Sequence, residues 1–183
     1  MKTWCCPICG YIIEKEKPKF CPVCNSTCEN FKLINENDEE SLSNKNNIGI
    51  ARDSDENMIC ELRNIFSQEC LEVGTYLAMS EVANQEGYSK ISDTLKEIAY
   101  EEANHASIMA QFLGEVIKTN TKDNLEMIIE GEYEATQAKL KLSKRAKEMG
   151  LDTIYNTLNK MCKDEAKHGK VFSSLLSEFF TQN

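Results

Sequence analysis

Apolar residues recur at helical spacing from about residue 55 to the end of the chain. The spacing is clearest in the first part of this region, at Leu71, Tyr76, Leu77, Met79 and Val82. A repeat of three to four residues places apolar side chains on one face of a helix. The region contains no proline, and its glycines fall mainly where the pattern breaks. We therefore predict a mainly α-helical domain over residues 55–183.

The breaks divide this domain into four helices. Gly87 ends the first helix, and a second is expected from about residue 88 to 118. A polar turn with an N-cap precedes a third helix at about 123–148, and Gly150 precedes a fourth at about 151–180. Four helices of roughly 25–30 residues with short turns predict an antiparallel four-helix bundle. Two separate helix hairpins are the alternative, but they would leave two apolar faces uncovered.

The part of the chain that precedes these helices has a different composition. Six of the nine cysteines lie within residues 1–34. Residues 35–54 are polar and rich in Asn, Ser and acidic side chains, a composition that buries too little apolar surface to fold alone. We therefore predict a small cysteine-rich module at 1–34, a polar linker at 35–54 and the helical domain at 55–183.

The cysteine-rich module contains two Cys-x-x-Cys pairs, Cys6 with Cys9 and Cys21 with Cys24. Each short turn directs two thiolates at one ion, so paired turns build a tetrahedral sulfur site. The spacing alone fits a zinc ribbon at least as well as an iron site. An odd number of cysteines without a secretory signal argues against disulfides. Cys5 and Cys28 are left over, and we expect both to be free thiols.

The helical domain contains an internal repeat. Glu-x-x-His occurs once in each half, and these two motifs contain the only two histidines of the chain. Residues three apart on a helix project from nearly the same face. A further glutamate precedes each motif at the same interval in both halves, which places it at the same height on the antiparallel partner helix. The aligned pairs are Glu69 with Glu132, Glu102 with Glu165, and His105 with His168.

This arrangement predicts a dinuclear metal site. A single Glu-x-x-His motif is a weak signal, but two motifs with both partner glutamates in register are much harder to obtain by chance. Buried carboxylates without partners are costly, and two divalent cations would balance four of them. Glutamates from two helices and Glu-x-x-His from the other two form a carboxylate-bridged di-iron or di-manganese site. Mixed nitrogen and oxygen ligands favour iron or manganese over structural zinc.

The two halves differ at one acid close to this site. Glu72 lies three residues after Glu69 on the same face, whereas its counterpart in the second half is Ala135. We predict that Glu72 is a seventh ligand that makes the two metals inequivalent; the alternative is a solvated acid. Tyr76, two turns after Glu69, is expected either to donate a hydrogen bond to a ligand carboxylate or to be an ordinary core residue.

These motifs together resemble a known family. Trp-x-Cys-Pro-x-Cys-Gly-Tyr at 4–11, followed by Cys-Pro-x-Cys at 21–24, resembles rubredoxin in a shortened form. The duplicated Glu and Glu-x-x-His pattern resembles the ferritin-like di-iron fold. Both on one chain resemble rubrerythrin, and a thiolate module that precedes the bundle matches the reverse rubrerythrin subgroup. The resemblance covers the whole chain except the linker.

The resemblance implies one iron at the four thiolates, where recombinant material can carry zinc instead, and two irons at the carboxylate site. Ordinary rubrerythrins carry an extra glutamate on the third helix, where this chain has Ala135. Any exchange of ligands during redox cycling can therefore differ here. The implied ligands are the bridging Glu102 and Glu165, the terminal Glu69 and Glu132, and one histidine on each iron, His105 and His168.

The resemblance also implies an oxidoreductase that reduces hydrogen peroxide, and in reverse members also dioxygen, to water. Electrons would come from an NADH-dependent reductase or a rubredoxin and pass through the thiolate iron. The chain has no Gly-x-Gly-x-x-Gly fingerprint, so the donor must be another protein. A domain-swapped homodimer is implied, with one subunit's thiolate iron near the partner's di-iron pair. The rival functions are a ferroxidase or iron-binding protein and a non-catalytic helical partner protein with a zinc ribbon.

The composition and net charge of the chain bear on which partners and which cellular location we expect. The net charge of −9 argues against a nucleic-acid partner, because phosphate binding depends on clusters of Lys and Arg. No apolar run approaches the roughly 20 residues that span a bilayer. The N-terminal stretch MKTWCCPICG lacks the apolar core of a signal peptide. We therefore expect a cytoplasmic protein without a membrane partner.

Overall fold

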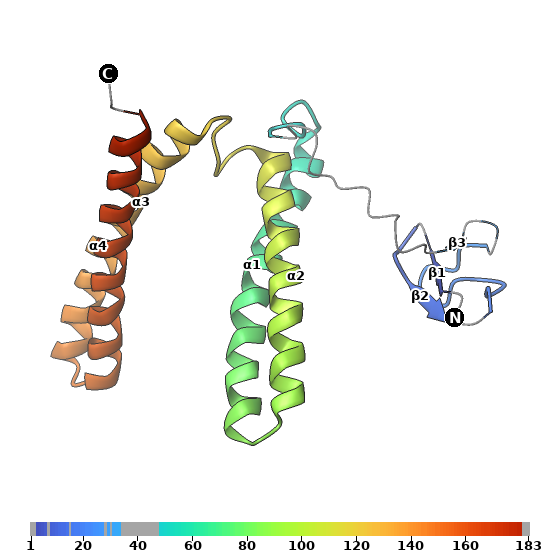
Figure 1. Ribbon diagram of the computed structural model, residues 1–183, viewed down its shortest axis with the longest axis horizontal. Coiled ribbons are helices and arrows are strands. Elements are labelled where there is room, and N and C mark those ends of the chain that lie inside the picture. Colours follow the sequence, from blue (N-terminus) through green and yellow to red (C-terminus); the bar gives the residue numbers. More distant parts are fainter. Residues whose placement is uncertain are drawn as a thin grey trace. The chain divides into compact units, whose positions relative to one another are not determined.

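The computed structural model (Figure 1) describes residues 3–6, 8–14, 16–27, 29, 31–33 and 48–180. The chain divides into two compact units, Met1–Asn46 and Asn47–Asn183. Most of the predicted linker, residues 35–47, lies outside the described residues, as does Cys28.

The N-terminal unit contains a small antiparallel sheet of strands β1 (Thr3–Cys5), β2 (Ile12–Glu14) and β3 (Lys32–Leu33), in the order β2-β1-β3. Its core is built around cysteine sulfurs: Cys6, Cys21 and Phe31 are buried, and Trp4 packs against them. So small a core contributes little hydrophobic stabilisation, and domains of this size usually depend on a metal or disulfides.

The C-terminal unit consists of four helices, as the periodicity predicts. They are α1 (Glu56–Gln85), α2 (Ser89–Leu113), α3 (Thr121–Glu148) and α4 (Asp152–Phe180). Asp55 and Asn120 cap the starts of α1 and α3, each accepting a backbone N–H bond three residues on. The predicted fold class is confirmed: a mainly α-helical protein of four helices with a small N-terminal cysteine module. None of the described helices is long and apolar enough to cross a membrane.

The second helix is shorter than predicted. It ends at Leu113 rather than near residue 118, because Gly114 adopts a left-handed conformation with φ of 61°. A glycine in this conformation is a common helix stop, since it has no Cβ to clash with the backbone. The amide of Gly114 still bonds to the carbonyl of Ala110, and the chain then turns away from the helix axis.

The turns between the helices of each pair have the same structure in both halves. Gly87 and Gly150 both have positive φ, 85° and 72°. The next amide in each turn bonds back to an alanine carbonyl, from Tyr88 to Ala83 at 2.8 Å and from Leu151 to Ala146 at 2.9 Å. The repeat in the sequence is therefore a repeat of structure, with one helix hairpin in each half.

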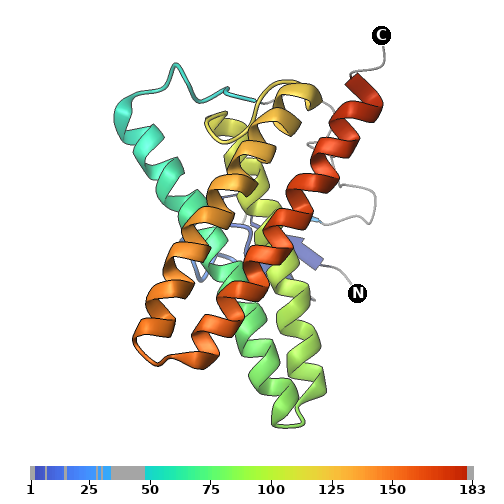
Figure 2. The ribbon, with the colours of Figure 1, turned by 90° about the vertical axis from the view of Figure 1, so that its left-hand side faces the viewer.

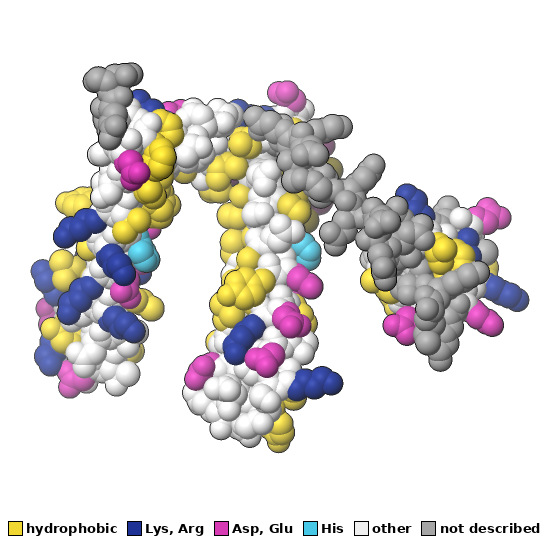
Figure 3. All heavy atoms as spheres, in the orientation of Figure 1, with side chains coloured by type: hydrophobic (Ala, Val, Ile, Leu, Met, Phe, Trp, Pro, Cys, Tyr) yellow, Lys and Arg dark blue, Asp and Glu magenta, His cyan; other side chains and the backbone are white. Residues whose placement is uncertain are grey.

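Within each hairpin the two helices run antiparallel and side by side (Figure 2). Among the described helices, contacts pair α1 with α2 and α3 with α4. Small side chains line the first seam and allow close approach of the helices; the buried ones are Ser80, Ala83, Ser92, Ala99, Ala106 and Ala110. Larger apolar side chains such as Leu71 and Val82 stay more than half exposed, and Figure 3 shows hydrophobic side chains along the hairpins. Each hairpin thus presents apolar surface that its own two helices do not cover.

A short segment before α1 is fixed to the end of α2. The amides of Gly49 and Ala51 bond to the carbonyls of Gln111 and Phe112 at 2.7 and 3.0 Å. A Cβ atom on Gly114 would lie 2.8 Å from the Cα of Gly49, so the two backbones touch. Residues 48–54, which were predicted to end the linker, are thus hydrogen-bonded to the helical unit.

Candidate metal centres

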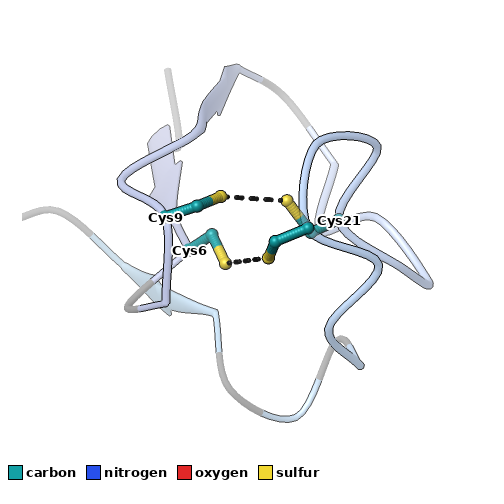
Figure 4. A group of neighbouring side chains, drawn as sticks. Cys6, Cys9 and Cys21 are labelled. Carbon is teal, nitrogen blue, oxygen red and sulfur yellow. Dashed lines mark hydrogen bonds between the residues drawn. The ribbon is translucent and has the colours of Figure 1, made fainter.

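The four predicted cysteine ligands lie together in the N-terminal unit. One sulfur from each of Cys6, Cys9, Cys21 and Cys24 falls within 4.8 Å of the others. The Sγ atoms of Cys6 and Cys24 are 3.6 Å apart, and those of Cys9 and Cys21 are 3.4 Å apart (Figure 4). A tetrahedral ion with metal–sulfur bonds of about 2.3 Å separates its sulfurs by about 3.8 Å. The cluster therefore has nearly the dimensions of a tetrathiolate site.

Two matching turns position these sulfurs. The residue after each Cys-x-x-Cys has positive φ, 73° at Gly10 and 57° at Asn25. Its amide bonds back to the carbonyl of the first cysteine, at 2.8 Å to Cys6 and 2.9 Å to Cys21. Glycine and asparagine are the residues that tolerate this conformation best. The two knuckles are thus copies of one backbone turn, which turns both sulfurs of each pair toward a common centre.

The crowding of the four sulfurs favours a bound cation. Burial opposes ionisation of Cys6, but hydrogen bonds from Ser26 and from the amides of Ile8 and Cys9 lower its pKa to about 6. The Tyr11 amide favours the Cys9 thiolate, yet burial and the neighbouring sulfurs outweigh it and raise the pKa of Cys9 to about 12. Four crowded sulfurs cannot all ionise without a counter-charge, and a bound metal removes this conflict.

Ser26 is a contact of the cluster that the spacing of cysteines did not indicate. Its Oγ lies 3.1 Å from Cys6 Sγ and 3.2 Å from Cys24 Sγ. Once these sulfurs are ionised, the Ser26 hydroxyl is placed to donate a hydrogen bond to either of them. In the sequence, this contact was indicated only by a hydroxyl residue two positions after Cys24, the fourth cysteine of the cluster.

In the first hairpin, Glu69 of α1 meets Glu102 and His105 of α2, and we call this group half-site 1. His105 Nδ1 lies 2.8 Å from Glu102 Oε2 and 3.5 Å from Glu69 Oε2. The Glu102 carboxylate raises the pKa of His105, mainly through this hydrogen bond. The predicted register between α1 and α2 is therefore the register that the structure has.

In the second hairpin, Glu132 of α3 meets Glu165 and His168 of α4, and this group is half-site 2. His168 Nδ1 lies 3.6 Å from Glu132 Oε2 and 3.6 Å from Glu165 Oε2. Figure 3 shows a histidine beside acidic side chains on each hairpin. Both halves of the repeat thus bring together the same three residue types from the same three positions.

Both half-sites are suited to a divalent cation. The Oε2 atoms of Glu69 and Glu132 are buried and accept no hydrogen bond, which is costly for a carboxylate. Burial, followed by Glu102, raises the pKa of Glu69; the neighbouring Glu165 carboxylate, followed by burial, raises the pKa of Glu132. Crowded carboxylates with raised pKa values and free oxygens are groups that a metal ion stabilises. Oxygen and imidazole ligands match iron or manganese.

Glu72 is not one of the three residues whose ligand atoms cluster in half-site 1. Its Oε1 accepts a bond of 3.0 Å from Gln68, and its Oε2 accepts one of 3.1 Å from the hydroxyl of Tyr76. Glu72 is still close enough to contribute to the raised pKa of Glu69. Tyr76 is therefore a hydrogen-bond donor to the Glu72 carboxylate, and the interpretation that it donates to a ligand stays a prediction, because it depends on Glu72. The ligand role of Glu72 stays a prediction.

Half-site 2 has a neighbour that the sequence reasoning missed. Lys139 Nζ of α3 lies 2.8 Å from Glu165 Oε1 of α4, and its side chain is 29% exposed. This hydrogen bond, followed by one from Glu132, lowers the pKa of Glu165 to about 2. The repeat aligns Lys139 with Tyr76. The change from tyrosine to lysine at this position was the indication in the sequence that the two half-sites have different neighbours.

An open groove of about 620 Å³ runs along α3 and α4 beside half-site 2. Glu132 and Glu165 both contribute to its lining, and Gly169 and Thr136 keep the side chains next to them small. The carboxylates of half-site 2 can therefore be reached from this groove within the hairpin.

Together, a helical domain with duplicated glutamate and histidine clusters and a module with four clustered thiolates define a non-haem iron protein. The donor sets fit one iron at the cysteines and a di-iron site at the two half-sites. The family model for rubrerythrin matches residues 62–176, and this chain belongs to the rubrerythrin family.

Two relatives extend this comparison beyond the helices. Reverse rubrerythrin-1 of Clostridium acetobutylicum is 41% identical over 181 residues, which cover 98% of this chain and 99% of that protein. An uncharacterised protein of Methanocaldococcus jannaschii is 36% identical over 142 residues, 78% of this chain and 99% of its own length. The predicted resemblance is confirmed. Members of this family are generally oxidoreductases, and the family supports a di-iron function in peroxide-related or oxidative-stress chemistry.

Proposed function

We propose that this protein reduces hydrogen peroxide to water with electrons from a separate NADH-dependent reductase, which enter at the four-cysteine site. The observation that carries the proposal is that one chain holds both a tetrathiolate cluster and a duplicated Glu, Glu and His cluster. A protein that only stores iron has no use for an attached electron-entry module. Dioxygen is a second oxidant that the same sites could reduce.

The overall reaction consumes hydrogen peroxide, two electrons and two protons and yields two water molecules. Iron held by Cys6, Cys9, Cys21 and Cys24 would supply one-electron transfer, and the irons held by the two half-sites would supply the two electrons that break the O–O bond. The protein itself contributes to the reaction by holding the ligand side chains in position. Each hairpin holds two carboxylates and one imidazole within 4.8 Å of one another, so the ligands need little rearrangement to bind.

A colour change tests this proposal. The iron-loaded protein is reduced anaerobically with dithionite, which bleaches the visible absorption of the iron tetrathiolate. After excess dithionite has been removed, about 1.5 equivalents of hydrogen peroxide per chain should restore the colour, because three Fe(II) ions supply three electrons and each peroxide accepts two. Glu102→Ala, which removes a predicted bridging ligand, should slow this return strongly, whereas the exposed Glu134→Ala should not. No return of colour, with Fe(II) oxidised and retained beyond the three expected sites, would favour the ferroxidase alternative.

We further propose that the working form is a homodimer in which the thiolate module of one chain serves the di-iron pair of its partner. Support comes from the family and from the apolar side chains that each hairpin leaves exposed, including Leu71, Val82 and Tyr133 at more than half of their surface. A second copy of the chain could cover such surface.

Mixed dimers distinguish the two possible routes of electron transfer. One variant lacks the thiolates (Cys9→Ser with Cys24→Ser), and the other lacks two predicted bridging ligands (Glu102→Ala with Glu165→Ala). Neither alone should turn over peroxide. Unfolding and refolding them together should restore roughly a quarter of the normal turnover if transfer crosses between subunits, because half of the dimers are mixed and each has one complete pair of sites. No recovery in verified mixed dimers would show that transfer stays within one chain.

A further inference from the structure

The two half-sites have the same backbone but different neighbours. Tyr76 and Lys139 occupy equivalent positions of the repeat, two helical turns after the first glutamate of each half. Tyr76 donates its hydroxyl proton to Glu72 at 3.1 Å. Lys139 instead reaches across to α4, where its ammonium donates to Glu165 at 2.8 Å. One half thus has a neutral donor where the other has a cation.

The acidic residues beside the two half-sites also differ, and this difference too makes half-site 1 the more negative one. Glu72 stands beside half-site 1, whereas its counterpart beside half-site 2 is Ala135. With every carboxylate ionised, three acids stand at or beside half-site 1, namely Glu69, Glu72 and Glu102. At half-site 2 the two acids Glu132 and Glu165 are partly neutralised by Lys139. The surroundings of half-site 1 are therefore more negative than those of half-site 2 by two charges.

The position of Lys139 makes this difference effective. Its ammonium bonds directly to a carboxylate of half-site 2, and the side chains of Lys139 and Glu165 are only 29% and 20% exposed. Charges this close together and partly withdrawn from water are weakly screened. A divalent cation held at Glu132, Glu165 and His168 is repelled by a fixed positive charge on its own hairpin. No such charge stands beside Glu102 in the structure as described, where Glu102 bonds to His105.

We propose that Lys139 is a positioning residue that makes the two metal positions unequal. A divalent ion then fills half-site 1 first and binds half-site 2 with lower affinity. When half-site 2 is empty, Lys139 takes over part of the role of the ion and holds Glu165 in place. The inference rests on the two-metal site and is independent of which oxidant reacts there.

A titration with Mn²⁺ tests the order of binding. The full-length protein is prepared with Zn²⁺ at the four cysteines and with its carboxylate sites emptied by a chelator. Mn²⁺ is a poor match for thiolates, so the added ion reports on the carboxylate sites. Free Mn²⁺ is measured by its electron paramagnetic resonance signal. The unmodified protein should bind two ions per chain with dissociation constants that differ by at least about tenfold.

Variants of Lys139 separate its charge from its packing. Lys139→Met should tighten binding of the second ion and so reduce the ratio of the two dissociation constants by at least about threefold, leaving the part that Glu72 causes, whereas Lys139→Arg, which keeps the charge, should preserve the ratio. Lys141→Met is the matched control, because Lys141 is exposed on the same helix, and it should have no effect. Lys139→Gln replaces Lys139→Met if circular dichroism shows that the latter does not fold.

Histidine variants identify the two positions. His105→Ala should remove the tighter binding event, and His168→Ala should remove the weaker one. Equal affinities in the unmodified protein, an unchanged ratio in folded Lys139→Met or Lys139→Gln, or the opposite histidine assignment would each overturn the inference. Failure of peroxide to restore the thiolate colour would leave this result unaffected, so the inference and the proposed function can fail separately.

Discussion

Glu69 and Glu132 lie at matching positions of α1 and α3, and each buries its Oε2 atom without a hydrogen bond. The same unpaired carboxylate oxygen thus occurs in each copy of the repeat. Each orphaned oxygen lies within 3.6 Å of the histidine of its own half-site. A buried carboxylate oxygen without a hydrogen bond disfavours the ionised form, and the first prediction follows from this.

The metal-free protein should become less stable as the pH rises. The pKa values of Glu69 and Glu132 are raised above the ordinary value of 4.5, so the folded chain holds these protons after the unfolded chain has released them. The free energy of unfolding therefore falls above pH 4.5, through the raised pKa values. The raised pKa of His105 acts in the same direction at higher pH. The lowered pKa of Glu165 stabilises the fold fully above pH 4.5, so it adds to the pH dependence only below that value. The lowered pKa of Cys6 acts in the opposite direction above about pH 6, so Zn²⁺ is kept at the four cysteines and only the carboxylate sites are emptied.

Urea denaturation at several pH values, with and without Mn²⁺, checks this expectation. Bound metal requires ionised carboxylates, so its stabilising effect should grow with pH. Glu132→Gln should weaken the pH dependence of the metal-free protein, and the exposed Glu134→Gln should leave it unchanged. Greater stability of the metal-free protein at pH 7 than at pH 5 would contradict the argument.

Glu72→Ala should lower peroxide turnover if Glu72 becomes a ligand once metal is bound. In the structure Gln68 and Tyr76 hold its two oxygens, and both bonds are exposed or only partly buried. Exchanging such bonds for a metal–oxygen bond is feasible, and the first metal position would then be the more altered of the two. Metal content and turnover are measured together, with Glu134→Ala as the control. Unchanged turnover at full metal content would identify Glu72 as a surface acid.

Ser26→Ala should lower the reduction potential of the iron tetrathiolate. A hydrogen bond to a ligand sulfur stabilises the reduced, more negative form of the site and so raises its potential. Ser26 is placed to provide such a bond to Cys6 or Cys24. Spectroelectrochemical titration of the visible band measures the change. Ser26→Thr keeps the hydroxyl and should retain the potential, and an equal potential in Ser26→Ala would show that the contact has no effect on the iron.

Gly114→Ala should destabilise the helical unit by about 1–3 kcal/mol. Gly114 has φ of 61°, and an added Cβ would lie 2.8 Å from the Cα of Gly49. Both the strained backbone and the displaced segment before α1 contribute to the loss. Gly74→Ala is the matched control, because a Cβ at this helical position meets nothing within 4 Å. Thermal denaturation of the metal-loaded proteins compares the two, and equal midpoints would refute the close contact.

Local features of the chain were predictable because they depend on neighbours in sequence. Glu102 and His105 share a face through the helical repeat alone, and the matching turns at Gly87 and Gly150 set the register with the preceding helix. The four cysteines cluster for a similar reason, since each knuckle is one short turn. For these features, the spacing along the chain already fixes how the residues lie in space.

Other features depend on side chains that reach across the fold. No periodicity indicates that Lys139 extends from α3 to Glu165 on α4, because a long flexible side chain has many possible partners. The same holds for Ser26, whose hydroxyl meets two sulfurs only after both knuckles have formed. The end of α2 at Leu113 depended on the left-handed conformation of Gly114, where a Cβ would also meet the backbone of Gly49, far away in sequence.

The amino-acid sequence by itself thus determined the helices, the duplicated hairpin and the residue types that gather at each metal centre, because repeating patterns act through local geometry. Only the tertiary structure decided which atoms meet once those elements have packed. It placed a cation beside Glu165 and a tyrosine beside Glu72, and so made two halves with nearly the same motif electrostatically different. The physical reason is that charge acts through distances in space, which spacing along a chain does not specify.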